Sequence, residues 1–178
     1  LSWWIVDFFK IAEEIQVQES LNDVTSEIYL TRNSRKISIT NVGFGVSQLL
    51  PIIAQFLTEN KKLYVVDEPE IHLHPSLQSK LADFFVSMSL MGKKILIETH
   101  SEAFLNRMIF LILKFDHLAT NIRMMWVENH PDGSKVSEVK YDDLGYLVNP
   151  PKGFLDQNKL TVQELTEIRM KKLKNDAV

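Results

Sequence analysis

The chain has 178 residues, of which 45% are hydrophobic, enough for one domain with a buried core and too few for two comfortable ones. Its 20 basic and 23 acidic residues leave a formal charge of -3, so the overall charge gives no reason to expect strong binding to a polyanion. The absence of cysteine excludes disulfides and thiolate metal sites, and no apolar run approaches the roughly 20 residues of a membrane-spanning helix. A soluble, cytoplasmic protein without a membrane partner is expected.

The first expected elements are a helix and a hairpin. Apolar residues recur at helical spacing in residues 4–15, which predicts an amphipathic helix that ends near residue 15. Two alternating stretches, residues 27–31 and 36–40, flank Asn33 and Ser34. Alternation around such a turn-forming pair predicts a β-hairpin.

Helices and strands then alternate along the chain. Helical spacing covers residues 45–57, and the short apolar runs at 63–66 and 95–97 predict strands that are buried on both faces. Further elements are expected as follows: a helix from Pro75 to about Gly92, a helix capped by Ser101 that runs to Leu113, strands at 122–127 and 135–139, and a last helix at 162–174. The order strand, helix, strand, helix implies a parallel sheet and an α/β fold.

The acidic pair Asp67-Glu68 comes directly after the first apolar strand. The carboxyl ends of parallel strands form the ligand-binding edge of such a sheet, so both carboxylates are expected where nucleotides bind. One acid of this kind can hold Mg²⁺ through water, and the next can polarise the water that attacks phosphorus. The alternative is structural, with Asp67 capping the following turn and Pro69 starting it.

Two further segments fit the same edge. His100 follows the second apolar strand, where it could contact a terminal phosphate, or simply cap the next helix. Gly43 and Gly45 precede a helix whose free amides could bind an anion, or they supply unusual backbone angles in a plain turn.

The order of these pieces carries a resemblance to a known family. The glycine-bearing segment 41–48, the string DEPEIHLHP at 67–75 and the Thr-His-Ser at 99–101 resemble the C-terminal lobe of ABC-type ATPases. These motif sequences are most similar to those of the prokaryotic branch related to SMC, RecF and OLD proteins, and the match covers residues 41–107. Residues 127–154 contain motifs similar to the C-terminal domain of unknown function in one subgroup of these AAA-type ATPases.

The resemblance implies an α/β fold of the P-loop NTPase type, with ATP and Mg²⁺ as ligands, and a role for each motif residue. It implies that Asp67 contacts Mg²⁺, that Glu68 is the general base and that His100 is the switch histidine. It further implies a signature segment that acts in trans on the nucleotide of a second head, formed by Asn41, Gly43, Gly45 and Ser47, and a loop at the dimer seam that carries His72 and His74.

The chain departs from the family in two places. Its signature reads Asn-Val-Gly-Phe-Gly instead of the common Ser-Gly-Gly pattern, and the 178 residues contain no Gly, four residues, Gly-Lys and Ser or Thr. In the family that phosphate-binding loop lies on an N-terminal lobe. Since the chain also opens on apolar residues without an initiator Met, we expect the parent protein to supply this lobe upstream. We expect the chain alone to be inactive as an ATPase.

One domain is expected over residues 1–178, with a lead-in at 1–40, the chemical motifs at 41–107 and a C-terminal subdomain at 108–178. The expected partners are a second ATPase head, the N-terminal lobe, and DNA or a nuclease or other effector in DNA repair or phage defence. Two alternatives stay open: a metal-dependent hydrolase that uses His72, His74 and His100 with Asp67, and a non-catalytic interaction module.

Overall fold

The computed structural model describes residues 1–19, 25–118, 120–142, 146–151 and 153–155, and the chain divides into two compact units, Leu1–Met108 and Ile109–Val178. Each unit is described by itself. The helix expected at 162–174 lies outside the described residues. Within the described part, no helix is both long and apolar enough to cross a membrane.

The N-terminal helix is shorter than the sequence predicted. A single π-helical segment, η1, covers Trp4–Phe8, and the chain then turns at Lys10, which has a φ of 57°. The prediction of a helix to about residue 15 is wrong, because the apolar Ile11 and Ala12 are buried in a segment without regular secondary structure. The Lys80 ammonium instead caps the end of η1 through the Phe8 and Phe9 carbonyl oxygens, at 2.7 and 3.1 Å.

A small antiparallel sheet follows η1. It consists of β1 (Glu14–Glu19), β2 (Ser26–Arg32) and β3 (Arg35–Ser38), in that order. The predicted hairpin is confirmed: Arg32 pairs with Arg35 across a turn in which both Asn33 and Ser34 have positive φ, as a two-residue hairpin turn requires. Strand β1 was not predicted, because the expected helix was extended to Ile15 and so covered the start of this strand.

The centre of the first unit alternates helices and strands. The short 3-10 helix η2 (Ile39–Asn41) leads into α1 (Phe44–Thr58), which continues through Pro51. The next elements are β4 (Tyr64–Asp67), α2 (Pro75–Leu90), β5 (Ile95–Glu98) and α3 (Glu102–Lys114). β4 and β5 pair in parallel, Tyr64 with Ile95 through Asp67 with Glu98, which confirms the predicted strand, helix, strand order. The other strand pairs in the described residues are antiparallel.

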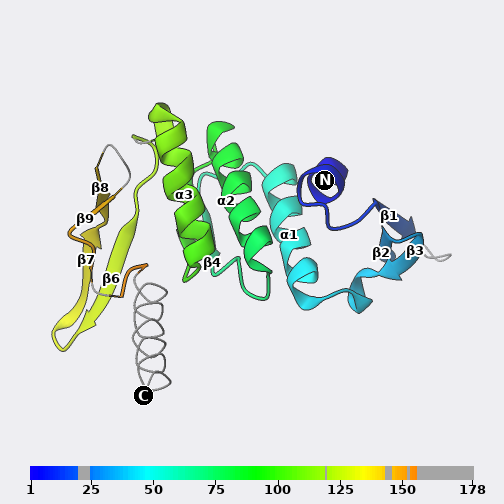
Figure 1. Ribbon diagram of the computed structural model, residues 1–178. Helices are drawn as coiled ribbons and strands as arrows, with labels where there is room; N and C mark the ends of the chain where they lie inside the picture. Colours follow the sequence, from blue (N-terminus) through cyan, green and yellow to red (C-terminus); the bar gives the residue numbers. More distant parts are fainter. Residues whose placement is uncertain (20–24, 119, 143–145, 152, 156–178) are drawn as a thin grey trace, which may run out of the picture. The chain divides into compact units, whose positions relative to one another are not determined.

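Aromatic side chains form the core beneath this parallel pair. In Figure 1 α1, α2 and the start of α3 lie side by side, with β4 behind them. Phe84 on α2 contacts Trp4 and Phe56, with ring centroids 4.8 and 5.7 Å apart, and Phe85 contacts Phe104 at the start of α3. These contacts fix the helices over one face of the sheet and so fix where both strands end.

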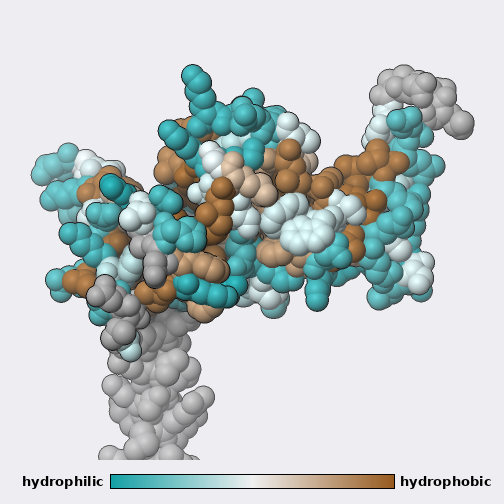
Figure 2. Space-filling view, turned by 90° about the horizontal axis from the view of Figure 1, so that it is seen from above, coloured by the Kyte–Doolittle hydropathy of each residue, from teal (hydrophilic) through white to brown (hydrophobic). Residues whose placement is uncertain are grey.

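The other face of the parallel pair is open. Val65 is 68% exposed and Leu96 is 59% exposed, so the prediction that both faces of these strands are buried is wrong for the described residues. The helices cover only the alternate side chains, such as Tyr64. In Figure 2, a view from above, hydrophobic atoms reach the molecular surface among hydrophilic ones. For β4 and β5, an open face that carries apolar side chains is typical of a sheet that another layer covers.

The second unit contains antiparallel strand pairs. η3 (Asp116–Leu118) is followed by β6 (Met125–His130), which pairs with β7 (Gly133–Glu138) across a turn at Pro131 and Asp132. The short strands β8 (Lys140–Tyr141) and β9 (Leu147–Val148) form a second pair. The Trp126 ring meets Phe154 edge to face at 5.7 Å. None of the predicted site residues lies in this unit.

Candidate functional site

The acidic pair lies at the carboxyl end of the parallel strands. Asp67 is the last residue of β4 and Glu68 follows it, with its backbone N–H donated to the Glu98 carbonyl at 2.9 Å. Glu68 has a φ of 42°, in the left-handed region that non-glycine residues rarely adopt. Such backbone strain costs of order 1–3 kcal/mol and is concentrated at functional sites. The strained turn sets the direction of the Glu68 side chain, and packing elsewhere in the chain must offset the free energy of this strain.

The structure brings His100 to the same edge. Its Nε2 lies 3.1 Å from Glu68 Oε1, with 78% of the His100 side chain and 33% of the Glu68 side chain exposed to solvent. The imidazole follows β5 and the carboxylate follows β4, so the parallel register is what joins them. A carboxylate acceptor and an imidazole donor are thus held in contact at an open surface, where both can reach a ligand.

Glu70 was not predicted as a site residue, yet it supports this pair. Only 5% of Glu70 is exposed, and its Oε1 accepts hydrogen bonds from the Thr99 hydroxyl at 2.6 Å and from the His100 backbone N–H at 2.9 Å. Its Oε2 is buried without a hydrogen-bond partner among the described residues. A buried polar atom of this kind costs about 1–3 kcal/mol, which the two hydrogen bonds at Oε1 must offset.

Gln78 makes a second link between the same loops. Its Nε2 donates to the Leu73 carbonyl at 2.9 Å, and its Oε1 accepts from the Ser101 hydroxyl at 2.7 Å. The Ser101 oxygen also accepts the Phe104 N–H at 3.0 Å, which confirms the predicted cap of α3. The amide of Gln78 thus joins residues before α2 to residues before α3.

The predicted signature residues surround the start of α1. Gly43 is the N-cap, and a Cβ added to it would have no heavy atom within 4 Å, so its backbone faces open space. No side chain of the described residues caps this helix start. Asn41 ends η2 in an exposed position, and the Ser47 hydroxyl donates to the Phe44 carbonyl at 2.8 Å. The first turn of α1 therefore presents backbone amides toward solvent.

Gly45 has a different surrounding. A Cβ at this position would lie 2.4 Å from the His72 carbonyl oxygen and 2.8 Å from its carbon. Gly45 thus lets α1 approach the backbone of residues 72–73, and His72 itself has a φ of 62°. The exposed Phe44 ring meets the His72 ring edge to face at 5.0 Å. A shallow hollow of about 150 Å³ lies between these segments, lined in part by Gly43, His72 and His74.

His74 serves the local fold. It is the N-cap of α2, and its Nδ1 lies 2.8 Å from the Ser76 hydroxyl and accepts the Ser76 N–H at 3.3 Å. In the described residues no group of three or more His, Cys, Asp or Glu side chains is arranged to hold a metal ion.

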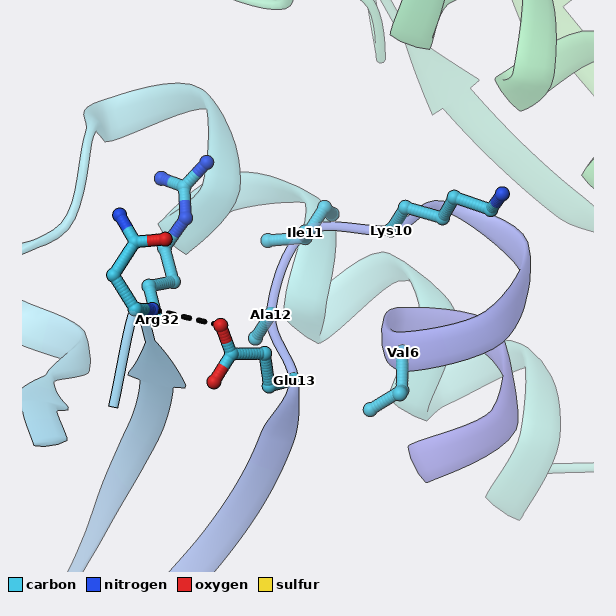
Figure 3. Close-up of a pocket in the computed structure, with 7 residues that line it drawn as sticks. Val6, Lys10, Ile11, Ala12, Glu13 and Arg32 are labelled. Carbon is cyan, nitrogen blue, oxygen red and sulfur yellow. Dashed lines mark hydrogen bonds between the residues drawn. The ribbon is translucent and has the colours of Figure 1, made fainter. Parts of the chain in front are cut away.

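A second hollow, of about 230 Å³, lies beside the N-terminal hairpin and is lined by Val6, Ile11 and Arg32 among others. Figure 3 shows Glu13 turned toward the hairpin turn, while Lys10 points away. Both Glu13 carboxylate oxygens accept turn amides, from Asn33 at 2.8 Å and Ser34 at 3.4 Å. Because the Glu13 carboxylate already binds the hairpin turn, we attribute a structural role to it and assign no ligand to this hollow.

The oxygen ligands at this edge of the sheet suit Mg²⁺. The Asp67 side chain is exposed and has no hydrogen bond or ion pair to any described residue, so it is free to contact a hydrated cation. An exposed oxygen ligand beside a second carboxylate suits Mg²⁺, which keeps several waters in its shell. Asp67 would hold the ion, and Glu68 and His100 would lie next to it.

The chain is similar to characterised ATPases in sequence and in fold. A family model described as an AAA ATPase domain matches residues 3–105, more than half of the chain. The Old nuclease of Escherichia phage P2 is 27% identical over 103 residues, which cover 51% of this chain and 18% of that protein. The chain thus spans less than a fifth of this relative.

Two solved structures share the fold. One, from work on ATP-driven dimerization and DNA-stimulated activation of SMC ATPases, has a TM-score of 0.55 at 14% identity and covers 89% of this chain and 86% of that one. The Smc head domain from Pyrococcus furiosus, bound to the C-terminal domain of ScpA, has a TM-score of 0.54 at 15% identity, over 92% and 36% of the two chains. All predicted site residues lie inside the matched segment 3–105, and the chain belongs to the AAA ATPase domain family, with the α/β P-loop NTPase fold of SMC and OLD-type ATPase heads.

Proposed function

We propose that this chain is the catalytic half of an ATP-hydrolysing head that works as a dimer. The observation that carries the proposal is the contact between Glu68 Oε1 and His100 Nε2, 3.1 Å apart, at the carboxyl edge of β4 and β5. Ligands of open α/β sheets bind at this edge. A base and a hydrogen-bond donor side by side, next to a free acid, suit the transfer of a phosphoryl group to water.

Each of the three side chains has a separate task. Glu68 orients the attacking water and accepts its proton. His100 donates a hydrogen bond from Nε2, to Glu68 before the nucleotide arrives and to the terminal phosphate afterwards. Asp67 holds Mg²⁺ through water, and the ion would supply positive charge against the phosphate oxygens. Because no bond to the protein forms, catalysis at this site is positioning and electrostatics.

A second lobe completes the head. The chain contains no sequence that could form the glycine-lysine loop, and the exposed Val65 and Leu96 leave one face of the sheet without cover. We infer that the lobe that carries the phosphate-binding loop packs on this face. Without that lobe the chain has no means to grip the triphosphate, so we expect it to be inactive alone.

A second head shares the nucleotide. The open backbone at Gly43 and the uncapped first turn of α1 suit a phosphate bound by the opposite head, which is where the signature would act. Asn41 and Ser47 would add side-chain contacts, and Gly45 would hold α1 against the loop that carries His72. His72 and His74 would lie at the seam between the two heads.

The cellular role follows from the relatives as a proposal. The Old nuclease is named for cleavage of nucleic acid, and the SMC work concerns DNA-stimulated activation, so DNA and a nuclease effector are the proposed partners. DNA repair or phage defence in the cytoplasm is the corresponding pathway. The net charge of -3 leaves DNA contact to a local surface or to the partner.

The test is ATP hydrolysis by the complete protein that contains this chain. We expect Glu68→Gln to lower kcat at least about 100-fold, because the amide cannot accept the proton, with ATP binding retained. Glu128→Gln is the matched control, since Glu128 forms the other described glutamate–histidine pair, with His130 at 3.6 Å on the β6–β7 hairpin, and should leave kcat unchanged. Normal turnover in Glu68→Gln would sink the proposal, because ATP would then be hydrolysed without this carboxylate.

A further inference from the structure

We propose that Glu70 is a positioning residue: its buried carboxylate fixes the backbone of the switch loop, residues 99–101, and thereby sets where His100 stands relative to Glu68. This inference rests on the proposed function, since it names a residue that the ATPase site needs without contacting the nucleotide. It assigns a task to a buried carboxylate whose second oxygen, Oε2, has no hydrogen-bond partner among the described residues.

The contacts of Glu70 are specific to the switch loop. One oxygen, Oε1, receives both the Thr99 hydroxyl, at 2.6 Å, and the His100 backbone N–H, at 2.9 Å. Glu70 is 5% exposed, so water does not compete at these bonds as it would at the surface. The Thr99 hydroxyl in turn accepts the Ser101 N–H at 3.1 Å. Every residue of the switch loop is thus tied, directly or through one atom, to this carboxylate.

The position of Glu70 in the chain explains why this matters for the site. It follows the catalytic Glu68 by two residues and precedes the strained His72 by two, and both neighbours have left-handed backbone, with φ of 42° and 62°. The seam loop, residues 70–74, and the switch loop are therefore anchored to each other at Glu70. The Gln78 amide adds a second link, from the Leu73 carbonyl to the Ser101 hydroxyl. A shift of the seam loop is expected to move His100.

The first experiment measures the hydrogen bond itself in this chain, independently of ATP. In Glu70→Ala the His100 amide loses its acceptor, and we expect its hydrogen exchange, followed by NMR, to become about tenfold faster. Thr99→Val keeps the shape of the side chain and removes one donor, so it serves if Glu70→Ala does not fold; the Ser101 amide should then exchange faster. Unchanged exchange at both amides would overturn the inference, whatever the activity of the protein.

The second experiment measures turnover in the complete protein. A displaced His100 should lower kcat about 100-fold in Glu70→Ala while KM for ATP stays the same, since positioning acts on the chemical step. Glu70→Gln keeps an oxygen acceptor at Oε1 and should restore kcat to within about threefold of wild type.

Asp83→Asn is the control for lost stability. It weakens the α2–α3 ion pair, in which the Arg107 guanidinium lies 2.8 Å from Asp83, away from the switch loop. If Asp83→Asn lowers kcat as much as Glu70→Ala, or if Glu70→Gln fails to restore it, Glu70 has no positioning role. If Glu68→Gln leaves kcat unchanged while Glu70→Ala still speeds hydrogen exchange at the His100 amide, the result counts against the proposed function alone.

Discussion

The two glycines at the start of α1 have different roles because their surroundings differ. A Cβ on Gly45 would meet the His72 carbonyl oxygen at 2.4 Å, whereas a Cβ on Gly43 would meet nothing within 4 Å. Both belong to the proposed signature segment. Gly45 is required by packing between α1 and the seam loop, and only Gly43 leaves its backbone open to a ligand.

This difference predicts losses of stability of different size for the same substitution at the two glycines. Gly45→Ala should destabilise the chain by about 1–3 kcal/mol, because the contact is with backbone that cannot turn aside. Gly43→Ala, whose backbone angles suit alanine, should cost less than about 1 kcal/mol, mainly through a poorer N-cap. Urea unfolding of the purified chain measures both. Equal losses would show that the close approach at Gly45 is not present in solution.

At this scale the sequence predicted some site residues and missed others for a physical reason. Asp67, Glu68 and His100 were predicted at one edge because they follow two apolar runs, and parallel strands end together. Glu70 and Gln78 were missed as supporting residues. Their partners in the switch loop lie more than twenty residues away in the chain, and a glutamate in a loop is usually exposed, so only the tertiary structure reveals that Glu70 is buried.

At the scale of elements, the parallel pair β4–β5 has one face packed by helices and one face open. Leu81 on α2 is fully buried, while Leu96 on β5 is 59% exposed. The same truncation at these two leucines therefore tests which faces are covered in the chain alone and in the complete protein.

In this chain Leu81→Ala should cost about 2–5 kcal/mol of unfolding free energy, and Leu96→Ala less than about 0.5 kcal/mol. In the complete protein we expect the cost of Leu96→Ala to rise above about 1 kcal/mol, because the second lobe buries that face. Denaturant unfolding of both proteins gives the comparison. A cost that stays near zero in the complete protein would mean that no lobe packs on this face.

Element prediction succeeded where pattern and packing agree. The helices from Phe44 and Pro75 and the strands at Tyr64 and Ile95 start within a residue or two of their predicted positions. Residues 9–15 were assigned wrongly, since Ile11 and Ala12 are apolar at helical spacing and buried, yet they lie outside any helix. Spacing cannot distinguish these two causes of burial.

At the scale of the whole molecule, the chain holds the base and the switch histidine of one proposed site and the signature of another. The two sets lie on separate segments of the first unit, at the ends of β4 and β5 and at the start of α1. In a dimer of heads each nucleotide would receive Glu68 from one head and Gly43 from the other. The division of the site between molecules is the central claim.

A mixing experiment tests this division. Gly43→Asp should fold normally, because the position is open and Asp is a favourable N-cap, but its charge should repel a phosphate at the α1 start. Glu68→Gln removes the base. Complete proteins that carry either change alone should be inactive as homodimers. In the Gly43→Asp homodimer both sites lack the open signature, and in the Glu68→Gln homodimer both sites lack the base.

The direct measurement is the ATPase rate of an equimolar mixture of the two variants after subunit exchange. We predict recovery to about a quarter of the wild-type rate, because half of the dimers are mixed and each mixed dimer has one intact site. A mixture as inactive as its two components would show that Glu68 and Gly43 act in the same site of the same head, and would contradict the account.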